Sequence, residues 1–178
     1  MSSKSIKCVF FDRDGIVNRC PNPVRYVMGV DAFHLLPEFV AALRVVDARG
    51  YKAVVVTNQS GVERGAMTME TVDEIHEHLH AELEKEGLGL LDVMVCTSAD
   101  DSHSHRKPNP GMLLDAAEKY GLDLAHSWMI GDQERDVVAG KRAGCGKTVL
   151  VRDTAKPTVA DFHLKSMAEL ADLLSQHL

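Results

Sequence analysis

The 178-residue chain is 45% hydrophobic and 26% charged, which is typical of a soluble globular protein, and its length suits one domain better than two. Its net charge of −6 argues against a general nucleic-acid binder, and no apolar run reaches the roughly 18 residues that a membrane span needs. The four cysteines are scattered without a CxxC pair, and the N-terminus lacks a signal-peptide pattern, so we expect a cytoplasmic protein.

Short apolar runs alternate with longer amphipathic segments along the chain. The apolar runs predict strands at 6–11, 51–57, 91–97, 128–131, 148–151 and 161–164. Helical periodicity predicts helices at 37–49, 68–86, 110–120, 134–143 and 167–177. This order is typical of an α/β fold, a doubly wound, Rossmann-like parallel sheet with helices on both faces. We expect residues 1–178 to form a single domain with no separate cap domain.

Polar side chains gather where the predicted strands end. Asp12 and Asp14 follow the first strand in the stretch FFDRDGIVN, Thr57 and Asn58 close the second, and Asp132 follows the fourth. Side chains two residues apart share one face of a strand, and two carboxylates so close raise each other's pKa or recruit a cation. Ligands of parallel sheets bind beyond the carboxyl ends of the strands, so these residues predict one site.

The residue types at this site suit a metal-assisted reaction on a phosphoryl group. Mg²⁺ prefers carboxylate and carbonyl oxygens, which Asp12, Asp14 and Asp132 could supply. The turn TNQSG at Thr57 offers a hydroxyl, an amide and backbone N–H groups that suit phosphate. Lys107 and the preceding Arg106 add positive charge. An aspartate in such surroundings can attack the phosphoryl group and form an aspartyl-phosphate.

Four stretches, FFDRDGIVN, VVVTNQSG, RKPNPGM and MIGDQERDVVAGKRAG, resemble in order the four motifs of the haloacid dehalogenase phosphatase superfamily. The resemblance spans roughly residues 6 to 152 and implies a Mg²⁺-dependent phosphomonoester hydrolase. It implies Asp12 as nucleophile and Asp14 as general acid and base. It also implies magnesium ligands from the side chains of Asp12 and Asp132 and the backbone carbonyl of Asp14.

The same resemblance assigns the residues around the phosphoryl group. It implies that Thr57, Asn58 and Gln59 hold this group and that Lys107 offsets the negative charge on it and on Asp12. Asp136, which completes GDxxxD, would orient either Lys107 or a metal-bound water.

TNQSGVERG and RKPNPGM are most similar to the D-glycero-D-manno-heptose 1,7-bisphosphate phosphatases of lipopolysaccharide precursor biosynthesis. Histidinol-phosphate phosphatases share their branch, so histidinol phosphate is the alternative substrate. We therefore expect a small phosphorylated metabolite as partner and neither nucleic acid nor membrane. The sequence leaves the oligomeric state open, and a monomer is compatible with it. Substrate selection would fall to residues 18–27, to residues 60–64 and to Arg106. The segment RCPNPVRYV is longer than in the heptose enzymes.

The branch usually carries a zinc loop of the form C-x-H, a gap, then C-x-C before RKP. This chain has Cys96, His103 and His105 at three of those positions, and Ser98 replaces the fourth ligand. Zinc could bind with an acidic side chain or water completing its shell. An unmetallated loop held by hydrogen bonds is the other interpretation, and both stay open.

Two further patterns have simpler explanations. HEHLH at residues 76–80 matches the HExxH of zinc proteases, but His76 and His80 flank an apolar helical stripe, and we expect a solvated or packing face. GCGKT at residues 144–148 is not a P-loop, because Lys141 stands where that motif needs glycine.

Two rival classes share parts of the pattern. A phospho-accepting signalling switch has no second acid two residues after the acceptor, so Asp14 argues against it. A catalytically inactive, interaction-only relative is disfavoured by the intact pair Asp12 and Asp14.

Overall fold

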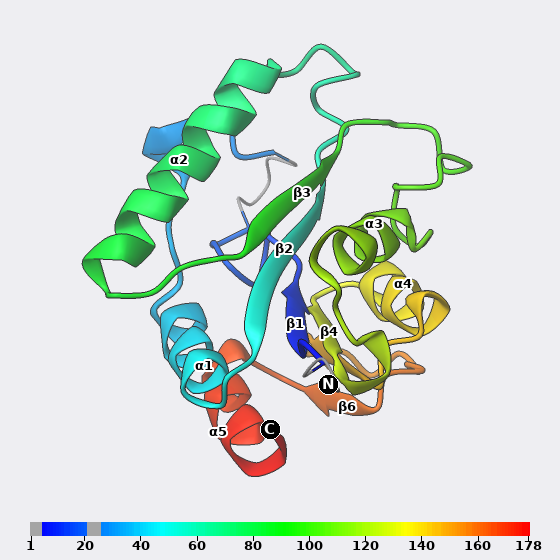
Figure 1. Ribbon diagram of the computed structural model, residues 1–178. Coiled ribbons are helices and arrows are strands. Elements are labelled where there is room, and N and C mark those ends of the chain that lie inside the picture. The colour runs from blue at the N-terminus through cyan, green and yellow to red at the C-terminus, as the bar shows by residue number, and fades with distance from the viewer. Residues whose placement is uncertain (1–4, 21–25) are drawn as a thin grey trace.

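The structure, a computed structural model, describes residues 5–20 and 26–178 (Figure 1). One parallel sheet of six strands runs in the order β3-β2-β1-β4-β5-β6. The strands are β1 (Cys8–Phe11), β2 (Lys52–Asn58), β3 (Asp92–Cys96), β4 (Trp128–Gly131), β5 (Lys147–Val151) and β6 (Phe162–Leu164). The predicted doubly wound α/β fold is confirmed.

The helices are α1 (Pro37–Ala48), α2 (Met69–Lys85), α3 (Gly111–Tyr120), α4 (Glu134–Ala143) and α5 (Leu170–His177). Short 3₁₀ turns lie at Val30–Ala32, Leu124–His126 and Met167–Glu169. The first strand is shorter than predicted, because Ile6 makes only an isolated bridge to Leu122. The last helix begins later than predicted, because its first residues form the 3₁₀ turn at Met167–Glu169. At the start of α2, the Thr68 hydroxyl accepts a hydrogen bond from the Thr71 N–H at 3.2 Å, as its capping role predicts.

Helices cover both faces of the sheet. Alternate strand residues point to opposite faces, so Val9 and Phe11 pack with α1, α2 and α5, whereas Phe10 packs with α3 and α4. Figure 1 shows α3 and α4 on one side of the strands and α1 and α5 on the other. A strand inside such a sandwich is apolar throughout, which explains the run of fully buried valines in β2.

The strand order fixes where a ligand site can form. From β1 the chain adds β2 and then β3 on one side, and it continues with β4 on the other side of β1. Crevices at such a switch point lie beyond the carboxyl ends of the strands. Phe11, the last residue of β1, is in register with Val55 of β2 and with Ile130 of β4, so Asp12 lies between these two strands near their carboxyl ends. The predicted site residues are therefore neighbours.

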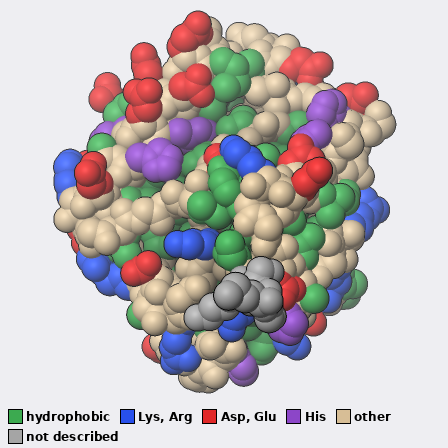
Figure 2. All heavy atoms as spheres, in the orientation of Figure 1, with side chains coloured by type: hydrophobic (Ala, Val, Ile, Leu, Met, Phe, Trp, Pro, Cys, Tyr) green, Lys and Arg blue, Asp and Glu red, His purple; other side chains and the backbone are tan. Residues whose placement is uncertain are grey.

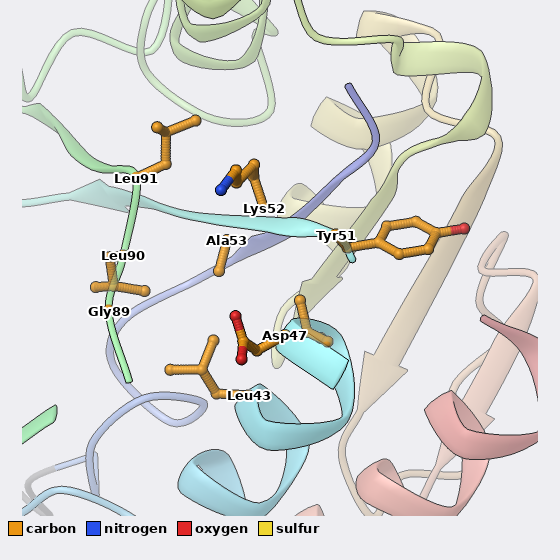
Figure 3. A pocket seen from close by; sticks show the side chains of 9 residues that line it. Leu43, Asp47, Tyr51, Lys52, Ala53, Gly89, Leu90 and Leu91 are labelled. Atoms are coloured by element: carbon orange, nitrogen blue, oxygen red, sulfur yellow. The ribbon is translucent and has the colours of Figure 1, made fainter. Parts of the chain in front are cut away.

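A pocket at the opposite end of the sheet holds none of those residues. It lies between α1, the start of β2 and the segment before β3, and its lining is largely apolar, with Asp47 and Lys52 among the polar residues (Figure 3). No helix within residues 5–20 and 26–178 combines the length and the apolar character needed to cross a membrane.

Candidate active site

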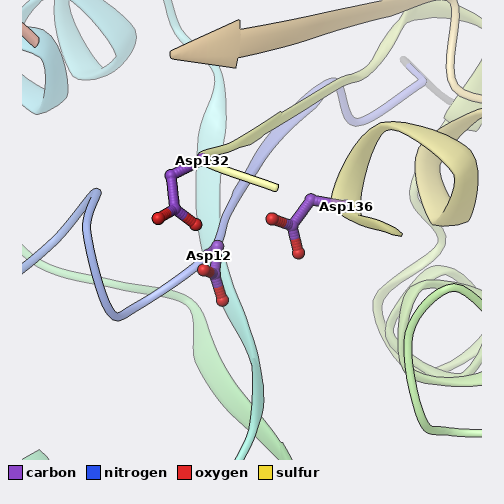
Figure 4. Close-up of side chains that lie close together, drawn as sticks. All are labelled: Asp12, Asp132 and Asp136. Atoms are coloured by element: carbon purple, nitrogen blue, oxygen red, sulfur yellow. The ribbon is translucent and has the colours of Figure 1, made fainter. Parts of the chain in front are cut away.

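Three carboxylates converge at the switch point. Asp12 follows β1, Asp132 follows β4 and Asp136 lies in the first turn of α4; one oxygen from each lies within 4.8 Å of the others (Figure 4). Asp136 is fully buried and Asp12 is only 6% exposed. So much negative charge away from water requires compensation.

Lys107 supplies part of that compensation. Its Nζ lies 2.7 Å from an oxygen of Asp12 and 2.7 Å from an oxygen of Asp136, and it also donates to the Val56 carbonyl at 2.8 Å. Burial alone would lower the pKa of Lys107, but the two carboxylates outweigh it and raise that pKa. Lys107 is therefore a fixed cation at the bottom of the site, only 2% exposed.

The acids still carry more negative charge than one lysine offsets. Burial, together with the charge of Asp136, raises the pKa of Asp12 to about 8 and that of Asp132 to about 6. A divalent cation beside them would relieve this repulsion, and carboxylates are the donors that Mg²⁺ prefers. The absence of a side chain at Gly15 leaves room for the Asp132 carboxylate, because a Cβ at Gly15 would lie 2.6 Å from one of its oxygens. The residues present therefore fit a magnesium ion.

Asn58 fixes the backbone of Lys107. Its side-chain amide donates to the Lys107 carbonyl and its side-chain oxygen accepts from the Lys107 N–H, both at 3.0 Å. This reciprocal pair ties the loop before α3 to the end of β2. The side chain predicted to hold phosphate is thus occupied in positioning the lysine.

The Asp14 carboxylate is surrounded by side-chain hydrogen-bond donors. Its two oxygens accept hydrogen bonds from Arg13 at 3.0–3.2 Å, from Asn18 at 3.0 Å and from Gln59 at 2.9 Å. Burial alone would raise the pKa of Asp14, but the Arg13 guanidinium and the hydrogen bonds outweigh it and lower that pKa. The two aspartates of the DxD pair therefore differ: the pKa of Asp12 is raised and that of Asp14 is lowered.

Gln59 links Asp14 to Thr57. Its fully buried amide donates to the Thr57 hydroxyl oxygen at 2.8 Å as well as to Asp14. Because the Thr57 oxygen accepts this bond, the hydroxyl proton stays available for a ligand. Gln59 therefore positions Thr57 and Asp14 relative to each other.

The Arg106 side chain is bonded within its own loop. Its guanidinium donates to an Asp101 carboxylate at 2.8 Å and to the Ser98 carbonyl at 3.0 Å. In this arrangement it stabilises the loop that precedes Lys107.

The candidate zinc ligands are only partly assembled. The Cys96 sulfur lies 3.8 Å from Nδ1 of His103, but Nε2 of His105 lies 2.6 Å from an oxygen of Asp115. Within the described residues, the only group of donors that closes to within 4.8 Å is the acidic one at Asp12. Hydrogen bonds therefore hold this loop in the structure.

The loops predicted to select the substrate are described in part. Residues 21–25, which belong to the longer segment after Asn18, lie outside the described residues. Beyond them, the Tyr26 hydroxyl lies 3.4 Å from that of Ser60, and its ring lies beside Gly61. The two segments predicted to choose the substrate therefore touch one another.

The two histidines of HEHLH have different surroundings. His80 is exposed, as expected for a solvated face, whereas His76 is 8% exposed and its Nε2 lies 3.3 Å from Nη1 of Arg13. Sequence reasoning missed Arg13 and His76 as parts of the site, and it placed Asn18 only in a substrate-selecting segment. An arginine between two aspartates at a strand end was the available signal for Arg13.

A parallel sheet whose switch point holds clustered acids and a buried lysine is typical of a hydrolase that acts on phosphoryl groups. The family model described as HAD-hydrolase-like matches residues 104–170. A D-glycero-beta-D-manno-heptose-1,7-bisphosphate 7-phosphatase of Salmonella typhi is 34% identical over 98% of both chains. The corresponding alpha-anomer phosphatase of Photorhabdus laumondii is 31% identical, over 89% of this chain and 88% of its own.

Solved structures agree with these relatives. The D,D-heptose 1.7-bisphosphate phosphatase from B. bronchiseptica, complexed with magnesium and phosphate, superposes with a TM-score of 0.84 at 32% identity, over 97% of this chain and 100% of its own. A putative HAD-like phosphatase from Mesorhizobium loti gives a TM-score of 0.83, also at 32% identity, over 97% of this chain and 86% of its own. The chain belongs to the haloacid dehalogenase-like phosphatases, in the family that contains these heptose bisphosphatases. The predicted resemblance is confirmed.

Proposed function

We propose that this chain removes the 7-phosphate of D-glycero-D-manno-heptose 1,7-bisphosphate in a Mg²⁺-dependent reaction through an aspartyl-phosphate. The observation that carries the chemistry is the buried Asp12, held 2.7 Å from Lys107 beside Asp132. The names of the relatives support the substrate. All residues used in the proposal come from a single chain. We propose that this chain forms one domain without a cap domain.

In the first step a carboxylate oxygen of Asp12 attacks phosphorus, and the bond between phosphorus and the sugar oxygen breaks. Asp14, in its protonated form, gives its proton to the departing sugar oxygen, which leaves as an alcohol. The free hydroxyl of Thr57 donates a hydrogen bond to the transferring phosphoryl group. Lys107 offsets the negative charge shared by this group and Asp12.

In the second step Asp14, now a carboxylate, takes a proton from water. The hydroxide formed attacks phosphorus, the bond to Asp12 breaks, and inorganic phosphate leaves. The donors around Asp14 favour its ionised form, which this step needs; the first step needs the protonated form, which the same donors oppose.

Magnesium would be held by the side chains of Asp12 and Asp132 and by the backbone carbonyl of Asp14. When bound, it supplies positive charge that brings the phosphate and the Asp12 carboxylate together despite their repulsion. Asp136 would orient Lys107, whose Nζ lies 2.7 Å from one of its oxygens.

The donor set for zinc is incomplete, and the proposed reaction uses no zinc. Because the Cys96 sulfur lies close to His103, the loop remains a candidate zinc site. Metal analysis of the purified protein, with Cys96→Ser as control, tests this. Zinc at one equivalent in the wild type and none in the variant would assign the loop a structural metal.

A cytoplasmic location suits the proposal. Within the described residues, Cys8, Cys20, Cys96 and Cys145 are all free thiols.

The test is phosphate release by purified protein with Mg²⁺. Both anomers of the heptose bisphosphate are offered, because the relatives include enzymes named for each, and histidinol phosphate serves as the comparison substrate. Asp12→Asn is the blank. Release from a heptose bisphosphate that exceeds release from histidinol phosphate and disappears in the blank supports the proposal. A preference for histidinol phosphate would make that compound the substrate in place of the heptose bisphosphate. Phosphate release by Asp12→Asn would overturn the mechanism.

A further inference from the structure

Arg13 is a fully buried guanidinium with partners on two sides. On one side Nε and Nη2 donate to the carboxylate of Asp14 at 3.0–3.2 Å. On the other side Nη1 lies 3.3 Å from Nε2 of His76, a residue of α2 that is 63 positions further along the chain. A buried cation is stable only if it is paired and its N–H groups find acceptors.

We propose that His76 is a positioning residue for Asp14 and acts by holding the Arg13 guanidinium against that carboxylate. The inference rests on the proposed function, in which Asp14 carries the protons. It goes beyond that function because His76 touches neither the substrate nor Asp14.

The chemistry of the contact fixes the state of His76. A guanidinium has donors and no acceptor, so Nε2 of His76 must offer its lone pair. The imidazole is therefore neutral and carries its proton on Nδ1. Burial and the Arg13 charge lower the pKa of His76 to about 4, in agreement with this state.

The packing of α2 makes the contact specific to one of the two histidines. His76 lies next to Ile75 on the buried side of α2, whereas His80, one turn later, is exposed. Figure 2 shows histidine and acidic side chains gathered on the surface over this helix. The charged and titratable groups around His76 are Arg13 on its inner side and, around an open surface pocket, Asp73, Glu77 and His80 of α2 and Asp92 of β3.

Without an acceptor at residue 76, one arm of Arg13 is left buried and unpaired. The guanidinium can recover that hydrogen bond only by rotating, and rotation disturbs its bidentate hydrogen bonds to Asp14. The orientation of Asp14 decides how well it protonates the departing oxygen. An alkoxide leaves slowly without that proton, whereas p-nitrophenolate leaves readily without it. Loss of His76 should therefore affect the two kinds of substrate unequally.

The experiment compares kcat/KM for the heptose bisphosphate with kcat/KM for p-nitrophenyl phosphate, because this parameter reports the steps up to leaving-group release. His76→Leu and His76→Met remove the acceptor, His76→Gln retains one, and His80→Leu is the matched control on the same helix. We expect the ratio of the two kcat/KM values to fall about tenfold or more in the Leu and Met variants, as befits a weakened general acid. It should recover in His76→Gln and stay at the wild-type value in His80→Leu.

An equal loss on both substrates would leave the ratio unchanged, would mean a merely structural role and would overturn the inference, as would full activity on both substrates. Absence of phosphate release from the wild type would overturn the proposed function itself, so the two failures are distinguishable.

A second measurement, made on the wild-type protein with His76→Gln for assignment, does not depend on catalytic activity. Two-bond ¹H–¹⁵N correlations of the histidine rings report which nitrogen carries the proton. One buried histidine, absent from the spectrum of His76→Gln, should show an unprotonated Nε2 at neutral pH. A proton on that nitrogen would overturn the inference.

Discussion

The ammonium of Lys107 lies 2.7 Å from a carboxylate oxygen of Asp12, although 95 residues separate the two in the chain. This pair is buried, and a third group, Asp136, shares the lysine. Removal of one member of a buried ion pair is costly because it leaves the other charge uncompensated.

Lys107→Met should therefore lower both stability and activity. We expect the free energy of unfolding to fall by about 3 kcal/mol, because Asp12 and Asp136 lose their cation. Turnover should fall by about 100-fold or more, because a preorganised charge at the reacting group is lost. Urea unfolding and phosphate release measure the two effects. Lys119→Met, which breaks an exposed pair with Asp92, is the control and should change little. A variant as active as the wild type would refute the role of Lys107.

The acidic cluster should respond to magnesium. In the wild type, Mg²⁺ at about 100 times its dissociation constant should raise the Tm by about 5 °C, because it binds only the folded chain. Asp132→Asn should abolish that shift. The same variant should be more stable than the wild type in EDTA, by about 1 kcal/mol, because it removes a carboxylate whose pKa is raised by its neighbours. Thermal unfolding with and without Mg²⁺ measures both effects, and the exposed Asp153→Asn serves as the control. An undiminished Mg²⁺ shift in Asp132→Asn would place the ion elsewhere.

Gly15 and Gly50 separate backbone strain from loss of space. Both have positive φ, +94° and +73°, but a Cβ at Gly15 would lie 2.6 Å from Asp132, whereas one at Gly50 meets nothing within 4 Å. Each Gly→Ala change should cost about 1–2 kcal/mol of stability through the left-handed backbone. Only Gly15→Ala should also weaken the Mg²⁺-dependent Tm shift and reduce turnover, by displacing Asp132. Equal activity in the two variants would contradict the role assigned to this space.

His76 should make stability depend on pH. Its pKa is lowered to about 4 in the folded protein, against about 6.5 in an unfolded chain. Below pH 6.5 residue 76 is protonated in the unfolded chain but stays neutral in the folded protein. The free energy of unfolding therefore falls as the pH drops from about 6.5 to about 4. The full loss from this residue is up to about 3 kcal/mol. Urea unfolding across that range should show a shallower decline in His76→Gln than in the wild type, with His80→Gln unchanged. Parallel declines in all three proteins would show that His76 is not held neutral.

Local sequence patterns were enough to predict the order of strands and helices along the chain, because apolar periodicity and glycine or proline at helix ends are local properties. The sequence also determined which residue types stand at the strand ends, and therefore the acids, the threonine and the lysine of the site. The expected strand at 128–131 and helix at 134–143 match the structure residue for residue.

The pairing of those residues depends on how distant parts of the chain pack together. Asn58 holds the Lys107 backbone, and Gln59 joins Asp14 to Thr57, so two side chains expected to hold phosphate also position other groups. The sequence suggested a solvated or packing face for His76, but the rotation of α2 against the sheet buries it beside Arg13. Hydrophobic patterning fixes which side of a helix is buried. It does not fix which polar atom at the edge of that side meets which partner, because this depends on the distance and angle between elements that are far apart in the chain.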